Sequence, residues 1–159
     1  MKKFVAVIAK TKAGKSTIIK SLTGCPSSNY RDFVEDKMTK RRIFVICGSP
    51  QEQDLSLDEL KDILKMVDSD SNCTGIVMAI QPTEPTRRLS MEDIFGEVKA
   101  AGSFQINAFT IDPNWRDARL DTSVAPRLSA LSVNSQKLDG RRFSIVNAAA
   151  INQATNIAT

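Results

Sequence analysis

A short basic loop near the start of the chain has the residue types that bind a polyphosphate. It consists of Ala9, Lys10, Thr11, Lys12, Ala13, Gly14, Lys15, Ser16 and Thr17. Gly14 allows a turn in which successive backbone N–H groups face an anion, and a helix starting there adds its positive end. An exposed Lys15 would supply charge for the terminal phosphates, and the Ser16 hydroxyl can ligate Mg²⁺. We therefore predict that residues 9–17 bind the phosphates of a nucleoside triphosphate with Mg²⁺.

The spacing of these residues nearly matches the P-loop pattern GxxxxGK[ST]. Gly14, Lys15 and Ser16 fill its last three places, and Ala9 stands where the first glycine is expected. The pattern also requires a strand before the loop and a helix after it. Residues 4–9 predict that strand and residues 16–22 that helix. The alternative interpretation is a lysine-rich strand-to-helix turn that has no ligand.

The elements that must position this loop alternate along the chain. The predicted strands cover residues 4–9, 42–47, 75–80, 106–111 and 143–146, with a short one near Phe33 and Val34. The predicted helices cover residues 16–22, 55–67, 90–101, part of 115–132, and 148–158. This alternation predicts an α/β fold with a mainly parallel sheet and helices on both faces. Ligands of such sheets bind beyond the carboxyl ends of the strands, where residues 9–17 would lie.

Composition limits the classes of function. The chain has 159 residues, of which 42% are hydrophobic, so we expect a single domain over residues 1–159. The absence of histidine excludes Ser-His and Cys-His nucleophile pairs. Cys25, Cys47 and Cys73 are too far apart in sequence for a zinc knuckle, and their odd number argues against a disulfide framework. The apolar runs are too short to cross a membrane or to form a signal sequence, so we expect a cytoplasmic protein.

The formal net charge is +4, which is mildly basic. A nucleic-acid surface, a polyphosphate ligand or an ordinary solvated surface would each account for it. The basic pairs are scattered along the chain and form no long tract. A dedicated nucleic-acid groove is therefore not indicated.

The segment AGKSTIIKSLTG at residues 13–24 resembles the first motif of Ras-like and Era/dynamin-like GTPases, in which GKSTLLNxLTG is common. Weaker matches follow in the order of that family: CGSPQE at 47–52 for DTAGQE or DTPG, FTID at 109–112 for NKxD, and VNA at 146–148 for the SA dipeptide. The resemblance covers nearly the whole chain. It implies a three-layer P-loop NTPase fold of the small GTPase type, binding GTP with Mg²⁺.

The resemblance also implies roles for single residues. Gln51 would orient the attacking water, and Thr39, placed only by its position, would ligate Mg²⁺ beside Ser16. Asp112 would accept hydrogen bonds from guanine N1 and N2. The guanine base would lie between the loops that follow strands 106–111 and 143–146, and Asn147 and Ala148 would contact it. A loop glutamine without a function and a turn-initiating Asp-Pro are the alternatives for Gln51 and Asp112.

Departures from the family pattern predict reduced activity. Cys47 replaces the aspartate that helps to hold Mg²⁺, and a thiol is a poor partner for a hard cation. Phe109 and Thr110 replace the asparagine and lysine that help to read guanine. We therefore expect weak or lost hydrolysis, a reduced preference for GTP, and a switch or structural nucleotide binder with an unknown protein partner.

Other P-loop classes remain open. Lys10 lies where ParA/MinD-like ATPases have their signature lysine, although the glycines of that motif are absent. A small kinase would need an arginine lid, for which the Arg87-Arg88 pair, Arg116 and Arg119 are candidates. A degenerate P-loop protein that acts through protein contacts without nucleotide is a third interpretation. The sequence leaves GTP against ATP undecided.

Overall fold

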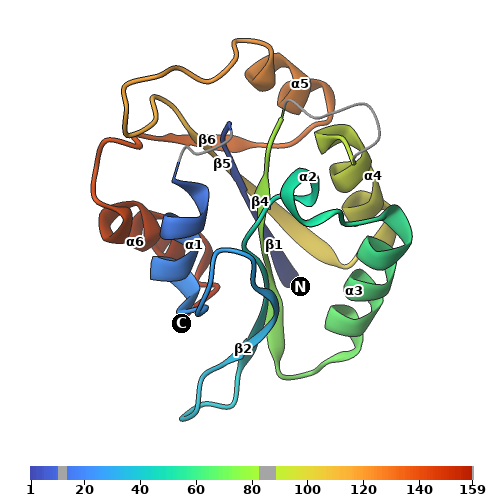
Figure 1. Ribbon diagram of the computed structural model, residues 1–159. Helices are drawn as coiled ribbons and strands as arrows, with labels where there is room; N and C mark the ends of the chain where they lie inside the picture. Colours follow the sequence, from blue (N-terminus) through green and yellow to red (C-terminus); the bar gives the residue numbers. More distant parts are fainter. Residues whose placement is uncertain (11–13, 83–88, 159) are drawn as a thin grey trace.

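The computed structural model describes residues 1–10, 14–82 and 89–158, except for the side chains of residues 51 and 52. Its strands are β1 Lys2–Ile8, β2 Arg31–Glu35, β3 Arg42–Ile46, β4 Cys73–Ile80, β5 Phe104–Ile111 and β6 Ser135–Leu138. They form one six-stranded sheet in the order β2-β3-β4-β1-β5-β6 (Figure 1). Only β2 is antiparallel to its neighbour, so the other five strands end at the same edge of the sheet. The loops after β1, β3, β5 and β6 therefore gather at this edge.

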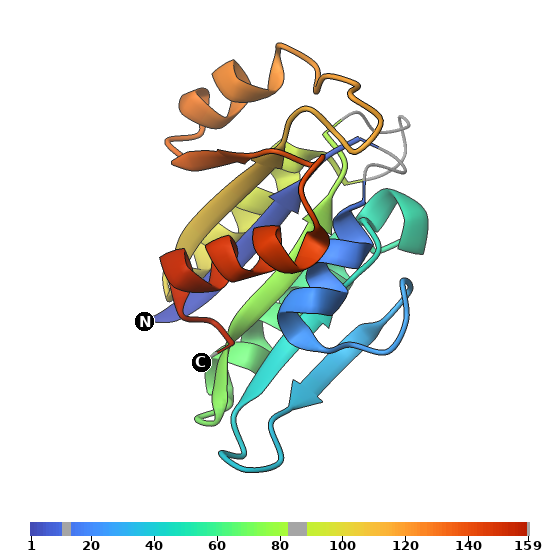
Figure 2. The ribbon, with the colours of Figure 1, turned by 90° about the vertical axis from the view of Figure 1, so that its left-hand side faces the viewer.

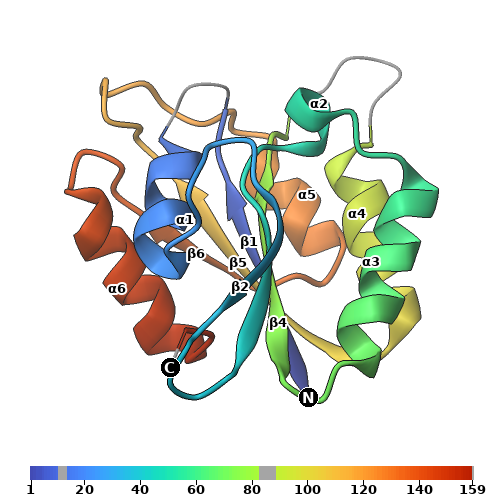
Figure 3. The same cartoon turned by 60° about the horizontal axis from the view of Figure 1, so that its bottom comes forward.

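The helices are α1 Lys15–Thr23, α2 Pro50–Gln53, α3 Leu57–Ser69, α4 Met91–Ala101, α5 Val124–Ala130 and α6 Ser144–Thr155. Helices α1 and α6 cover one face of the sheet, whereas α3, α4 and α5 cover the other (Figure 3). This arrangement confirms the three-layer α/β fold and the mainly parallel sheet. Within the described ranges, no helix combines the length and apolar character needed to cross a bilayer.

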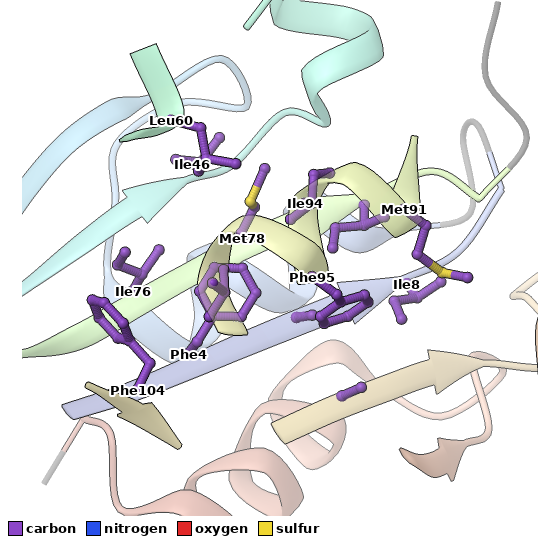
Figure 4. Packing of buried hydrophobic residues seen from close by; sticks show 14 of the residues in the cluster. Phe4, Ile8, Ile46, Leu60, Ile76, Met78, Met91, Ile94, Phe95 and Phe104 are labelled. Atoms are coloured by element: carbon purple, nitrogen blue, oxygen red, sulfur yellow. The ribbon is translucent and has the colours of Figure 1, made fainter. Parts of the chain in front are cut away.

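Alternation along the buried central strand accounts for the two cores. In β1, Phe4 and Ile8 face the core under α3, α4 and α5, whereas Val5 and Val7 face the core under α1 and α6. Phe4 meets Phe95 of α4 edge to face, with ring centroids 6.2 Å apart (Figure 4). Both faces of β1 are thus covered by apolar side chains, which holds the loop at its end in place.

Helix boundaries follow the local signals in the sequence. A capping box opens α4, in which the Ser90 hydroxyl accepts the Asp93 N–H at 3.0 Å and the Asp93 carboxylate accepts the Ser90 N–H at 3.1 Å. Gly24 and Gly102 end α1 and α4 with left-handed backbone, a conformation that favours glycine.

The last predicted strand, residues 143–146, is wrong. Those residues begin α6, and the last strand is β6 at Ser135–Leu138. Three of the four side chains of β6 are exposed, so this edge strand has no apolar run to mark it. The apolar run at 143–146 is instead exposed at the start of a helix, with Phe143 at 82% and Ile145 at 70%. The apolar run predicted a buried strand, but its apolar side chains are exposed.

The helix expected within residues 115–132 is confined to α5. Pro126 is the third residue of α5, where the missing backbone N–H would have no partner inside the helix, so proline does not interrupt it. The residues between β5 and α5 form a long loop at the carboxyl edge of the sheet.

Two glycines provide a matched test of the packing. A Cβ on Gly75 of β4 would lie 2.0 Å from the Lys3 carbonyl oxygen of β1, whereas a Cβ on Gly96 of α4 would meet nothing within 4 Å. We expect Gly75→Ala to lower the free energy of unfolding by about 1–3 kcal/mol, since the strands must separate. Gly96→Ala should raise it by roughly 0.5–1 kcal/mol. Urea unfolding measures both, and a neutral Gly75→Ala would contradict the close pairing.

Candidate functional site

The predicted strand–loop–helix arrangement is present at the end of β1. The Ala9 N–H donates to the Ile80 carbonyl at 3.1 Å, which prolongs the pairing of β1 with β4 by one residue. Gly14 caps α1 with a φ of 88°, a left-handed conformation that favours glycine. Thr11, Lys12 and Ala13 lie outside the described residues. The first turn of α1 contains no acidic residue, so its positive end is not neutralised locally.

Lys15 is buried, not exposed as we expected. Only 5% of its surface is accessible, and its Nζ donates to the carbonyl oxygens of Ala9 and Lys10 at 3.0 Å each. A buried ammonium group needs such acceptors, because its desolvation is otherwise costly. The cation is therefore held by its own loop, and a phosphate would have to replace these carbonyls as its partner.

The end of β3 lies against the start of α1. The Cys47 thiol is 1% exposed and donates to the Ser16 carbonyl at 3.6 Å. This contact places the Cys47 sulfur beside Ser16, the predicted Mg²⁺ ligand. The GTPases that the sequence resembles have a carboxylate at this position. In the part of the chain that the structure describes, no three His, Cys, Asp or Glu side chains are grouped to hold a metal.

Two predicted residues are not brought to Ser16. Thr39 lies in the turn between β2 and β3, at the opposite end of the sheet from the start of α1 (Figure 2). Its hydroxyl accepts the Arg41 N–H at 3.3 Å. The two predicted metal ligands are therefore far apart. Gln51 lies in α2, and its side chain is outside the described part, so its role as water-orienting residue stays a prediction.

Asp112 follows β5, but its carboxylate is held by neighbouring residues. Oδ1 accepts the Leu120 N–H at 3.1 Å and lies 2.8 Å from Arg119 Nε, and Oδ2 lies 3.7 Å from Lys137 Nζ. Burial by itself raises the pKa of Asp112. The Leu120 hydrogen bond and the two cations more than offset this effect, so the pKa lies below its usual value. Asp112 thus braces the loop between β5 and α5.

Asn147 and Ala148 both lie inside α6 instead of in a loop. Asn147 is 3% exposed, and its Nδ2 donates to the Asp139 carbonyl at 3.0 Å, which fastens α6 to the loop after β6. Ala148 is 4% exposed and packs in the core under α1 and α6. Of the two, only Asn147 reaches the cavity beside α1.

This cavity has a volume of about 540 Å³ and lies between the start of α1, the loop after β5 and the loop between β6 and α6. It occupies the position predicted for a base, once β6 replaces 143–146 as the last strand. Its lining residues are Gly14, Ser16, Thr17, Ile18, Trp115, Gly140, Arg141, Arg142, Phe143, Ser144 and Asn147. The start of α1, where the sequence predicted phosphate binding, therefore borders this cavity.

The two loops beside the cavity are clamped to each other. The Gly140 N–H donates to the Pro113 carbonyl at 2.8 Å, and a Cβ on Gly140 would lie 2.7 Å from that same oxygen. Arg141 bridges Asp117 at 3.1 Å and Asp139 at 2.9 Å. Hydrogen bonds from Arg141 lower the pKa of Asp139 to about 2. The cavity wall is thus preorganised by contacts that leave little freedom at Gly140.

Most of the cavity wall after β6 was not predicted from the sequence. Arg141, Arg142 and Phe143 were not singled out as site residues, because β6 was not recognised. An Asp-Gly pair at 139–140 was the available signal, since it indicates a turn between two elements.

Comparisons with known proteins bear on the fold alone. Neither the family models nor the curated proteins include a match to this chain. The NMR structure of a de novo designed protein with a P-loop NTPase fold superposes with a TM-score of 0.51 over 97% of this chain and 92% of that chain, at 9% identity. The FeoB G-domain from Methanococcus jannaschii superposes more weakly, with a TM-score of 0.48 over 99% of this chain and 98% of that chain, at 19% identity. The chain has the P-loop NTPase fold.

The bracing by Asp112 predicts a pH-dependent loss of stability. Asp112→Asn removes the negative charge that pairs with Arg119 and Lys137 but keeps an oxygen that can accept the Leu120 N–H, and we expect the free energy of unfolding at pH 7 to fall by about 1–2 kcal/mol, given that Arg119 is exposed. A lowered pKa stabilises the fold above the usual aspartate value near ~4, and this contribution disappears as the pH falls through the folded-state pKa. The difference between wild type and variant should therefore shrink in acid.

Urea unfolding between neutral and acidic pH measures this effect. Asp62→Asn is the matched control, because Asp62 is exposed on α3 and the substitution makes the same charge change. We expect the control to stay within ~0.5 kcal/mol of wild type. A constant difference for Asp112→Asn at all pH values would show that its charge does not brace the loop.

Proposed function

We propose that this protein binds a nucleoside triphosphate with Mg²⁺ at the start of α1. The observation that carries the proposal is the position of Lys15, the first residue of α1, between Gly14 and Ser16, which both line the 540 Å³ cavity. Phosphates placed at this helix end would meet the Lys15 ammonium and backbone N–H groups. The nucleoside would occupy the cavity that Ser16, Thr17 and Ile18 line.

Binding would exchange one set of partners of Lys15 for another. The ammonium now donates to two neutral carbonyls, Ala9 O and Lys10 O. A phosphate oxygen is charged, and charge-assisted hydrogen bonds are about twice as strong as neutral ones. The Ser16 hydroxyl would contribute one Mg²⁺ ligand, with water and phosphate oxygens completing the shell. This exchange makes binding favourable although Lys15 is buried.

We further propose that hydrolysis is slow. Cys47 supplies no carboxylate beside Ser16, and Thr39 lies at the far end of the sheet. Both departures weaken the hold on Mg²⁺. The expected preference for GTP depended on Asp112, whose carboxylate is engaged with Arg119 and Leu120, so the placement of this residue gives GTP no support.

A protein that works through contacts with other proteins and binds no nucleotide is the second candidate. The burial of Lys15 against its own loop favours it, because the cation is satisfied without a ligand. A small kinase receives less support. Arg116 lies over Trp115 and Arg119 pairs with Asp112, while Arg87 and Arg88 lie outside the described residues.

Replacement of Lys15 separates the first two candidates. Lys15→Ala should lower the affinity for labelled GTP and ATP by roughly ten- to a hundredfold, the loss expected for one charge-assisted contact. Lys20→Ala, on the same helix and with the same charge change, should bind like wild type. Fluorescence titration with and without Mg²⁺ measures this, and circular dichroism checks the fold. Wild-type protein that binds neither nucleotide would favour the second candidate.

Replacement of Cys47 tests the account of hydrolysis. We expect wild-type turnover below about 1 s⁻¹, the lower end for ordinary enzymes. Cys47→Asp should make nucleotide affinity depend more strongly on Mg²⁺, because a carboxylate can order the metal shell beside Ser16. Cys47→Ser is the control of similar size without a charge. Phosphate release and thermal unfolding at several Mg²⁺ concentrations measure both effects, and fast wild-type turnover would refute the account.

A further inference from the structure

Trp115 stands at the mouth of the cavity with 54% of its surface in solvent. A Cβ on Gly14 would lie 3.8 Å from Trp115 Cδ1, so the ring lies directly beside the start of α1. Phe143, which is 82% exposed, lines the same cavity. Exposed aromatic side chains gathered around a cavity are typical of a binding site, and Trp115 does not have the packing role common for a lone tryptophan.

The loop that carries Trp115 is held by hydrogen bonds to the Asn114 side chain. The Asn114 side-chain oxygen accepts the N–H groups of Arg116 and Ala118 at 2.9 Å each, and Asn114 is only 5% exposed. The Arg116 guanidinium lies over the indole, with its Cζ 4.4 Å from the ring centroid. A ring that is already positioned loses little conformational entropy when a flat ligand stacks on it.

The cavity offers no charged acceptor for a base. Among the residues that the structure describes, those lining it are apolar, hydroxylic, amide or cationic, and none is acidic. Guanine presents N1–H and N2–H donors where adenine has none, so a site selects guanine by leaving an acceptor unpaired with adenine. Asp112 is not among the lining residues, and its carboxylate is already engaged by Arg119 and the Leu120 N–H.

We infer that Trp115 holds the base of the nucleotide by stacking, and that the cavity takes guanine and adenine nucleotides alike. The inference rests on the proposed triphosphate site at Lys15. Aromatic stacking tolerates any base, because each base has a π-face. Purines have the larger face and make more contacts with the ring, so they bind more tightly than pyrimidines. Trp115 is thus the residue that determines specificity for purines.

The test uses Trp115 as its own reporter, because it is the only tryptophan in the chain. Wild-type protein is titrated with GTP, ATP, CTP and inorganic tripolyphosphate in the presence of Mg²⁺, with free N-acetyltryptophanamide correcting for absorption by the bases. A stacked base quenches the indole, whereas tripolyphosphate has no base. We expect GTP and ATP to quench with dissociation constants within about threefold of each other, and CTP to bind more weakly.

Variants measure the contribution of the ring. Trp115→Ala should lower the affinity for labelled ATP and GTP by roughly five- to 150-fold, the range for loss of one stacked base. Trp115→Phe should retain most of the affinity, and both variants should bind tripolyphosphate like wild type in calorimetry. Met38→Ala is the control, because Met38 is 93% exposed in the turn between β2 and β3, at the other end of the sheet.

The outcomes separate this inference from the proposed function. A GTP preference of about tenfold or more, or a selective loss of GTP affinity in Asp112→Asn, would show guanine reading and overturn the inference. Wild-type nucleotide affinity in Trp115→Ala, or equal affinity for tripolyphosphate and ATP, would also overturn it and leave the phosphate site standing. If neither tripolyphosphate nor any nucleotide binds the wild type, the proposed function itself fails.

Discussion

Parallel pairing of β1 with both β4 and β5 determines where the chain leaves the sheet at Ile8. Both edges of β1 are hydrogen-bonded and both faces are covered by apolar side chains, so the strand can neither slide nor turn over without losing a core. Gly14 then turns the chain into α1, which packs back on the same sheet. The positions of Ala9, Gly14 and the start of α1 are a consequence of this pairing.

Electrostatics at this loop are balanced within the protein. A buried Lys15 would be unstable without acceptors, and the carbonyls of Ala9 and Lys10 provide them. In the proposed function, a phosphate would have to compete with these neutral carbonyls for one ammonium group. The same principle applies beside the cavity, where Arg119 and Arg141 are occupied by Asp112 and Asp139. Charges that could act on a ligand are largely used to shape the loops.

Stacking and hydrogen bonding place different demands on a binding site. Hydrogen-bond reading needs an acceptor that is buried and unpaired before the ligand arrives, which is costly in the free protein. A stacking surface needs only a positioned ring. The clamp between Gly140 and Pro113, together with the turn at Asn114, supplies that position for Trp115. The lining of the cavity therefore fits the proposed stacking better than hydrogen-bond recognition of a base.

Local sequence determined much of this protein by itself. The buried runs of β1, β3, β4 and β5, the glycine that opens α1 and the capping box at Ser90 depend on neighbours in the chain, and the structure contains each of them. The three-layer fold follows from their alternation. The P-loop spacing likewise predicted a helix at residues 16–22 directly after Lys15, and α1 begins one residue earlier, at Lys15.

Only the tertiary structure decided the rest, because those features depend on residues far apart in sequence. The edge strand β6 is held by pairing with β5 and has no apolar run of its own. The apolar run at 143–146 was therefore predicted as the last strand in its place. The partners of the Asp112 carboxylate lie on a loop and on β6, and no spacing rule links them. Thr39 could be assigned only by its position along the chain. The antiparallel turn of β2 carries it to the opposite end of the sheet, because the direction of a strand is set by its partner and not by its own residues.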